Sequence, residues 1–232
     1  MQRRVLSKAQ FQPASDQSLL VSFGREITRA ANEQVRKLVR LLELEPIAGV
    51  RNLHPAYCSL LIKFDPLRTS HEELQAILVE YFDRLEKLHL PAPRTVEIPV
   101  CYGDELGPDL PDLCKLHSLS TQEAIQLHSA PSYIVYFLGF VPGFAYLGEL
   151  PSRLVTPRLA SPRKIVPAGS VGIAGSQTGV YPFATPGGWR LIGRTPLQIF
   201  RPDREHLSLL AIGDRVRFVP ITAERFAELQ RP

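Results

Sequence analysis

The residues best suited to chemistry lie in one basic stretch of the sequence that contains no acidic residue. Between Leu150 and Pro202 there is no Asp or Glu. The seven cations inside this stretch are Arg153, Arg158, Arg163, Lys164, Arg190, Arg194 and Arg201. Guanidinium groups bind planar carboxylate or phosphate oxygens through paired hydrogen bonds, so the stretch suggests a cleft for a small anion. The alternative is a set of solvated loops whose charge is balanced across space by the acids between Asp104 and Asp112.

Aromatic, glycine and proline residues interleave these cations, and such loops on a β scaffold commonly form pockets. The candidate anion-binding residues are Arg158, Arg163, Gln177, Tyr181 and Arg194. The expected pocket wall consists of Phe140, Pro142, Phe144, Tyr146 and Trp189. Each ring could equally be an ordinary core residue that closes the end of a barrel.

His128 is the candidate catalytic residue, because an imidazole titrates near neutral pH and can act as an acid or a base. It ends a short helix that the capping box of Ser120 and Glu123 predicts. The alternative role for such a histidine is capping the helix C-terminus. The sequence contains no G-x-x-x-x-G-K-[ST] phosphate loop, G-x-S-x-G elbow, H-E-x-x-H motif or histidine pair at metal spacing. We therefore predict neither a nucleophilic triad nor a metal site.

Two differently built halves must position these residues. The first half predicts a strand over 18–23, a helix over 27–42, one or more strands over 57–64 and a helix over 70–85. This order suggests a small α+β sandwich of the split βαβ kind, over residues 1–92. Pro91-Ala92-Pro93 then resembles a stiff linker.

The second half, residues 93–232, is predicted to be mainly β. Only two of the 15 glycines precede residue 103. Besides the capped helix that ends near 128, short strand-like runs separated by Gly/Pro turns indicate a barrel or sandwich. The predicted strands cover 96–102, 133–138, 170–174, 189–193, 197–200 and 216–219.

Composition excludes several classes of protein. The chain has 232 residues, 44% hydrophobic and 22% charged, which is typical of a folded soluble protein. The net charge of +4 is spread evenly and forms no basic tail, so we expect no nucleic-acid partner. No apolar run approaches a membrane span or a secretory signal, and the three cysteines do not suggest a disulfide scaffold. We expect a cytoplasmic protein.

The second half resembles the allophanate hydrolase subunit 1 family, a carboxyltransferase-type family that includes the B subunit of 5-oxoprolinase and the sporulation kinase inhibitor KipI. The resemblance is carried by several segments in the same order, with weaker similarity in the first half and at the end of the chain. These segments are 138–147 (LGFVPGFAYL), Pro157-Arg158, Pro162-Arg163, 166–171 (VPAGSV), 177–182 (QTGVYP) and 186–196 (PGGWRLIGRTP).

The resemblance implies a ferredoxin-like N-terminal domain and a cyclophilin-like β-barrel C-terminal domain. It also implies a subunit-2-type partner, the C subunit of 5-oxoprolinase, and a third amidohydrolase-like subunit. Such a complex opens 5-oxoproline, a small carboxylate, to glutamate using ATP, although this chain has no nucleotide motif. The alternative is a KipI-like regulator that binds a sensor histidine kinase without catalysis. A prolyl isomerase is a third possibility, which rests on the fold alone.

Overall fold

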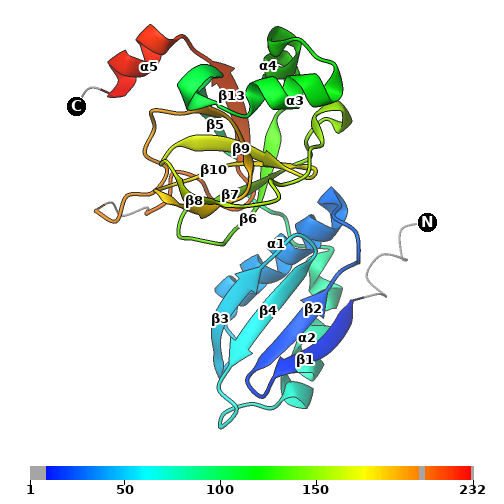
Figure 1. Cartoon of the computed structure of the whole chain (residues 1–232). Coiled ribbons are helices and arrows are strands. Elements are labelled where there is room, and N and C mark those ends of the chain that lie inside the picture. Colours follow the sequence, from blue (N-terminus) through cyan, green and yellow to red (C-terminus); the bar gives the residue numbers. More distant parts are fainter. Residues whose placement is uncertain (1–8, 204–206, 231–232) are drawn as a thin grey trace. The chain divides into compact units, whose positions relative to one another are not determined.

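The computed structural model of the chain describes residues 9–203 and 207–230. It divides the chain into two compact units, residues 1–92 and 93–232 (Figure 1). Each unit has its own hydrophobic core, one built from residues before the division and the other from residues after it.

The first unit contains a four-stranded antiparallel sheet in the order β1-β2-β4-β3. Its strands are β1 (Gln10–Ser15), β2 (Ser18–Ser22), β3 (Val50–Pro55) and β4 (Ser59–Phe64). β2 and β4 are the central pair, and the residues of β4 alternate between buried and more exposed positions. The sheet therefore has one face that must be covered by apolar side chains.

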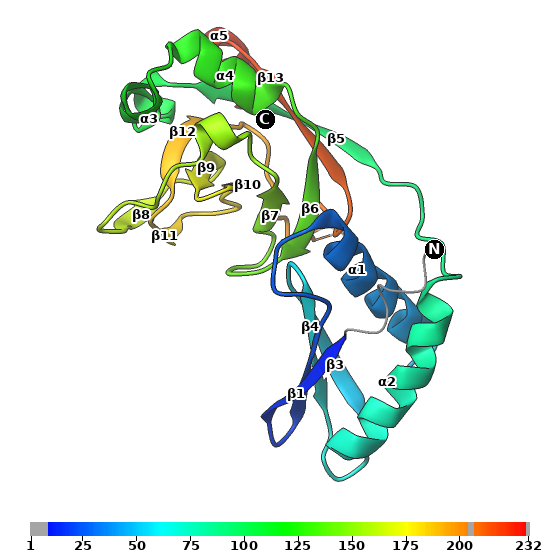
Figure 2. The same ribbon diagram turned by 90° about the vertical axis from the view of Figure 1, so that its right-hand side faces the viewer.

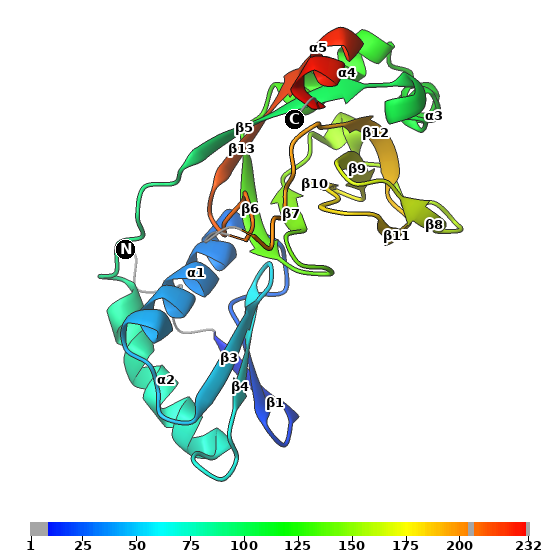
Figure 3. The same cartoon turned by 90° about the vertical axis from the view of Figure 1, so that its left-hand side faces the viewer.

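Two helices, α1 (Arg29–Leu44) and α2 (His71–Leu85), cover that face (Figures 2 and 3). Thr28 caps α1 through its side-chain oxygen, and Ser70 with Glu73 forms the capping box of α2. The helices bury Val35, Leu38, Leu74 and Leu78 against Leu60 and Ile62 of β4. Burying about six aliphatic side chains of this kind stabilises the unit by roughly 1.5–3 kcal/mol each, before the entropy of folding is counted.

The second unit is a closed barrel in which β13 runs parallel to β5 and every other neighbouring pair is antiparallel. In the described residues its strand order is β10-β7-β6-β13-β5-β12-β9. The bounds are β5 (Thr95–Tyr102), β6 (Tyr133–Leu138), β7 (Ala145–Gly148), β9 (Ser170–Ala174), β10 (Gln177–Val180), β12 (Arg190–Arg194) and β13 (Arg215–Pro220). The fold class is thus an α+β unit followed by a mainly-β barrel.

Short helices lie around the strands of the barrel. They are η2 (Asp104–Leu106), α3 (Leu110–His117), α4 (Thr121–Ser129), η3 (Ser152–Leu154) and α5 (Ala223–Gln230). α3 and α4 contact each other and lie against β12 and β13, respectively (Figures 1 and 2). Leu110, Leu113 and Ala124 of these helices join the barrel core, so the helices close the apolar interior.

A two-stranded ribbon outside the barrel positions the candidate site. It pairs β8 (Arg163–Val166) with β11 (Thr185–Gly187) in antiparallel fashion. The ribbon contributes to a second cluster, separate from the barrel core, of Phe144, Val166, Ala174, Tyr181, Trp189 and Leu191. This aromatic-rich cluster is the foundation of the pocket described below.

Several sequence predictions can be compared with these elements. The helices that follow Ser70 and Ser120 are confirmed with their capping boxes. The predicted strand over 197–200 is wrong, because the segment is irregular and only Phe200 forms an isolated bridge, to Ser208. The sequence did not predict the strands β1, β3, β7, β8, β10 and β11 or the helices α3 and α5. Among the described residues, no helix is long and apolar enough to span a bilayer.

Candidate functional site

A pocket with a volume of about 280 Å³ lies beside the β8–β11 ribbon. Its lining comes from β7 and the loop before it, from the segment before β8, and from β11 and the segments on either side of it. The lining residues are Phe140, Phe144, Tyr146, Arg158, Pro162, Tyr181, Pro186, Gly187, Gly188 and Trp189. Most of this surface is aromatic, proline or glycine, which makes the pocket apolar with few polar groups.

The aromatic wall is a set of rings that pack edge against face. Phe144 is the central ring, with ring centroids 5.3 Å from Trp189 at 90° and 5.0 Å from Tyr146 at 66°. Tyr146 and Trp189 in turn lie 5.9 Å apart. Phe144 and Trp189 are buried, at 1% and 5% exposure. Since each ring is held by its neighbours in a favourable geometry, the wall is preformed.

Tyr181 and two glycines complete the wall. The Tyr181 ring is buried and lies 5.2 Å from the ring of Phe144. A Cβ atom at Gly187 would come within 2.5 Å of the Tyr181 hydroxyl oxygen. Glycine at this position is therefore a condition for placing the tyrosine. Burial raises the pKa of both Tyr146 and Tyr181, so both phenols stay neutral at ordinary pH.

Arg158 is the one formally charged residue of the pocket lining among the described residues. Its side chain is exposed, and within 9–203 and 207–230 its guanidinium makes no hydrogen bond or salt bridge. It lies close enough to Tyr146 and Tyr181 to oppose, weakly, the rise that burial causes in the pKa of each phenol. An uncompensated guanidinium therefore lies beside an apolar wall.

Arg163 was predicted to face the same anion, but it has a protein partner. Its Nη2 donates to Asp109 Oδ1 at 2.6 Å, and its Nη1 donates to the Trp189 carbonyl at 3.5 Å. Asp109 is buried, and its Oδ2 accepts from the Leu191 amide at 2.6 Å. The acid comes from the stretch between Asp104 and Asp112, so for this cation the balanced-charge alternative is the one the structure supports. Arg163 and Asp109 fix the backbone on both sides of Arg190.

Arg194 and Gln177 also lie away from the pocket lining. Arg194 pairs with Ser170 across β12 and β9, and burial lowers the pKa of its guanidinium. The Nε atom of Arg194 and the Oγ atom of Ser170 are buried without hydrogen-bond partners. Gln177 begins β10 opposite Ala174. The predicted convergence of five residues is therefore reduced to Arg158 and Tyr181.

His128 occupies the barrel interior at 1% exposure. Thr178 Oγ1 donates to the Gly172 carbonyl at 3.0 Å, so it must accept from His128 Nε2–H at 2.9 Å. His128 Nδ1 then accepts from the Tyr102 hydroxyl at 2.8 Å. This arrangement defines a neutral imidazole, and burial lowers its pKa from 6.5 to about 3. With both nitrogens occupied and no access to solvent, His128 is a core residue, and the acid–base role predicted for it does not fit this position.

The remaining wall residues divide between two hollows. Phe140 lies at the pocket rim with 59% exposure and a left-handed φ of 69°. Pro142 lines a second, shallow hollow formed by residues 138–143, which Phe140 also lines.

The sequence analysis did not include four of the lining residues, Pro162, Pro186, Gly187 and Gly188. Three of these lie in the Pro-Gly-Gly-Trp run, whose turn-forming composition was the available signal.

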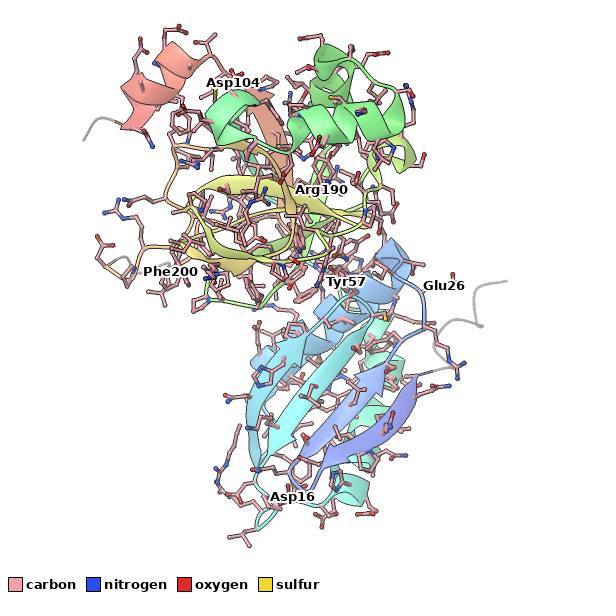
Figure 4. All side chains as sticks on the ribbon, viewed as in Figure 1. Asp16, Glu26, Tyr57, Asp104, Arg190 and Phe200 are labelled. Atoms are coloured by element: carbon pink, nitrogen blue, oxygen red, sulfur yellow. The ribbon has the colours of Figure 1, made fainter. Side chains whose placement is uncertain are left out.

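Arg190 shows how another cation of the basic stretch is used (labelled in Figure 4). It begins β12, and its Nε donates to the Pro157 carbonyl at 3.1 Å. This contact joins β12 to the residue that precedes Arg158, so Arg190 helps to hold the loop that carries the pocket cation. Its role is structural in this arrangement.

The sequence matches the family of the carboxyltransferase domain, subdomain C and D, over residues 9–210. The chain belongs to this family. Within it, the chain is 41% identical to the B subunit of 5-oxoprolinase from Bacillus subtilis (strain 168) over 231 residues, covering 94% of this chain and 95% of that protein. It is 45% identical to the B subunit of 5-oxoprolinase from Escherichia coli O157:H7 over 199 residues, covering 84% and 88%.

The crystal structure of the protein TTHA0988 is similar to the structure of this chain, with a TM-score of 0.78 and 38% sequence identity. The match covers 90% of this chain but 41% of TTHA0988, so the other protein continues well beyond the shared part. The resemblance found in the sequence segments is thus confirmed at the level of the family. Chemically, a pocket with aromatic walls and one free guanidinium can bind and orient a small anion.

Proposed function

We propose that this chain is a non-autonomous subunit of an ATP-dependent 5-oxoprolinase. The observation that carries the proposal is its similarity to the B subunit of the Bacillus subtilis 5-oxoprolinase along almost the whole length of both chains. The reaction adds water across the lactam C–N bond of 5-oxoproline, which produces the second carboxylate and the free amine of glutamate. ATP hydrolysis drives this ring opening.

The ionisable residues of the pocket indicate which steps of the reaction this chain can carry out and which belong to its partners. Its ionisable residues are Arg158, Tyr146 and Tyr181. An arginine is always protonated, and the two buried phenols have raised pKa values, so none of the three serves as a base near neutral pH. The sequence also has no phosphate-loop motif. We therefore assign ATP binding and proton transfer to partner chains, a subunit-2-type protein and an amidohydrolase-like subunit, and substrate recognition to this chain.

The fold of the chain fits the proposed family role but does not itself decide the division of work between the subunits. We take the first unit, with the order β1-β2-β4-β3 and two helices on one face, as a variant of the ferredoxin-like arrangement in which the outer strand β1 comes from the N-terminal hairpin. We take the closed barrel of the second unit as cyclophilin-like. Fold alone does not carry function, so the proposal depends on the full-length relatives and on the pocket.

Genetic complementation tests the proposal. A Bacillus subtilis strain that lacks the B subunit of its own 5-oxoprolinase should regain growth on 5-oxoproline as the nitrogen source when it expresses this chain. An empty vector is the control. Stable expression of the chain without recovery of growth, in a strain that the native subunit does rescue, would contradict the proposal.

A further inference from the structure

We infer that the pocket beside the β8–β11 ribbon binds the ring of a small cyclic amide acid, 5-oxoproline, with its carboxylate paired to Arg158. This inference rests on the proposed function and assigns the substrate to one site in this chain. Four properties of the pocket support it: its size, its wall, its single charge and its rigidity.

The volume of the pocket limits the ligand to about one small ring. At about 280 Å³, the pocket lies just below the range of ~300–1,000 Å³ that is usual for drug-sized ligands. A five-membered lactam with one carboxylate is a compact ligand of this class. A nucleoside triphosphate is much larger and carries several negative charges, which the mainly apolar lining would leave unpaired.

The wall suits the faces of a small, mostly aliphatic ring. Phe144, Tyr146 and Trp189 stand edge to face around one another, at ring-centroid distances of 5.0–5.9 Å. Pro162 and Pro186 add further apolar surface. The methylene groups of a lactam ring can contact these surfaces without leaving a polar group buried and unpaired, because the ring's amide and carboxylate lie on one side.

The single charge of the pocket favours a carboxylate over a phosphate group. Arg158 has no partner among the described residues, whereas Arg163 is paired with Asp109 and Arg201 with Asp203. A single guanidinium matches the two oxygens of one carboxylate in a planar, bidentate pair. Phosphate groups usually need several donors, and the lining offers no second cation. The ligand that matches this site therefore carries one carboxylate beside one apolar ring.

Contacts within the chain hold the pocket wall in place. The Asp109 carboxylate and the Arg163 guanidinium hold the backbone at Trp189 and Leu191, and the Tyr181 ring packs against Phe144 with a ring-centroid distance of 5.2 Å. Phe144, Tyr181 and Trp189 are each at most 5% exposed. A preformed wall avoids much of the ordering cost of binding, so a small ligand can bind measurably.

The test uses Trp189, the only tryptophan of the chain, as a fluorescent reporter in the pocket wall. The full chain is titrated with L-5-oxoproline, and binding is repeated by calorimetry. We expect a saturable change in tryptophan fluorescence. Arg158→Gln should raise the Kd by about ten- to a hundredfold, which corresponds to the loss of one charged hydrogen-bonded pair. Arg158 is exposed, so this variant should fold normally.

Two controls test whether the change in Kd comes from Arg158 in the pocket and from the carboxylate of the ligand. Arg153→Gln removes an exposed cation of η3 that is outside the lining, and it should leave the Kd within about twofold. The ligand 2-pyrrolidinone has the lactam ring without the carboxylate. It should bind at least about tenfold more weakly than L-5-oxoproline, and Arg158→Gln should not change its Kd.

Two results would overturn the inference: no saturable binding of L-5-oxoproline by either method, or equal effects of Arg158→Gln and Arg153→Gln. The activity of the assembled complex separates this failure from failure of the proposed function. If the complex forms glutamate and Arg158→Gln leaves kcat/KM unchanged, the pocket assignment is wrong and the proposed role in the complex stands. If the complex with the wild-type chain forms no glutamate, the proposed role in the complex is wrong.

Discussion

Replacing Asp109 by alanine should destabilise the barrel unit more than any exposed ion pair could. The Asp109 carboxylate is buried and serves two donors, the Arg163 guanidinium at 2.6 Å and the Leu191 amide at 2.6 Å. Leu191 is itself buried at 2% exposure, so its amide has no solvent to replace the lost acceptor. The substitution therefore breaks a charged pair and leaves a backbone donor unsatisfied.

The expected cost follows from these two losses. A hydrogen bond to a charged group contributes about 1.5–3 kcal/mol, and an unsatisfied buried donor costs about 1–3 kcal/mol. Because the Arg163 side chain keeps 29% exposure, water recovers part of the first loss. We expect Asp109→Ala to lower the free energy of unfolding by about 3–5 kcal/mol. Asp109→Asn keeps an acceptor for one donor and should cost about 1–3 kcal/mol.

Urea denaturation followed by Trp189 fluorescence is a suitable assay, because the reporter lies two residues from Leu191 in the same unit. Glu97→Ala is the matched control. Glu97 also pairs with an arginine, Arg217 at 3.3 Å, but both side chains are 59% exposed. That control should change stability by less than about 1 kcal/mol. Equal, small effects of Asp109→Ala and Glu97→Ala would refute the view that this pair holds the pocket backbone.

Three further predictions concern stability and can be measured by the same denaturation assay. His128 is neutral in the fold with a pKa of about 3 against 6.5 unfolded, so its contribution is complete above pH 6.5 and is lost as the pH falls toward 3. Wild type should lose about 2–3 kcal/mol more than His128→Gln between pH 7 and pH 4.5; identical pH profiles would contradict this. Gly187→Ala, whose Cβ would meet the Tyr181 hydroxyl, should cost about 1–3 kcal/mol, whereas Gly188→Ala should be nearly neutral. Ser120→Ala removes the cap of α4 and should cost about 0.5–2 kcal/mol, and no loss would mean that the capping box contributes little.

Local patterns in the sequence predicted those elements whose determinants are close together along the chain. Ser70 with Glu73 and Ser120 with Glu123 close hydrogen bonds three residues apart, so the starts of α2 and α4 can be read directly. β1 was missed because its sequence QFQPAS is polar, contains a proline and lies at the sheet edge, where only pairing with β2 makes it a strand.

Long-range partners account for the other differences. The run at 197–200 has strand composition, but the Leu197 amide donates to the Thr195 hydroxyl instead of to a neighbouring strand. Composition cannot reveal whether a ladder partner exists.

For the candidate site, too, the sequence could not show the contacts between residues that are far apart along the chain. The aromatic and glycine-rich runs pointed to the pocket wall, and the acid-free stretch contained Arg158. Arg163, however, is neutralised by a residue 54 positions away, and the two hydrogen-bond partners of the His128 imidazole ring are 26 and 50 positions away. Such contacts depend on how the barrel closes. The sequence therefore indicated which residues could bind an anion, and the fold determined which of them are free to do so.

Reconstitution of the enzyme tests directly whether this chain is a required subunit of a 5-oxoprolinase. The partner subunits of a 5-oxoprolinase are purified, and ATP-dependent formation of glutamate from L-5-oxoproline is measured with and without this chain. We expect turnover only when the chain is present, none from the chain alone, and a kcat/KM lowered about ten- to a hundredfold by Arg158→Gln. Equal turnover in the absence of the chain, or full turnover by the chain alone, would contradict this expectation.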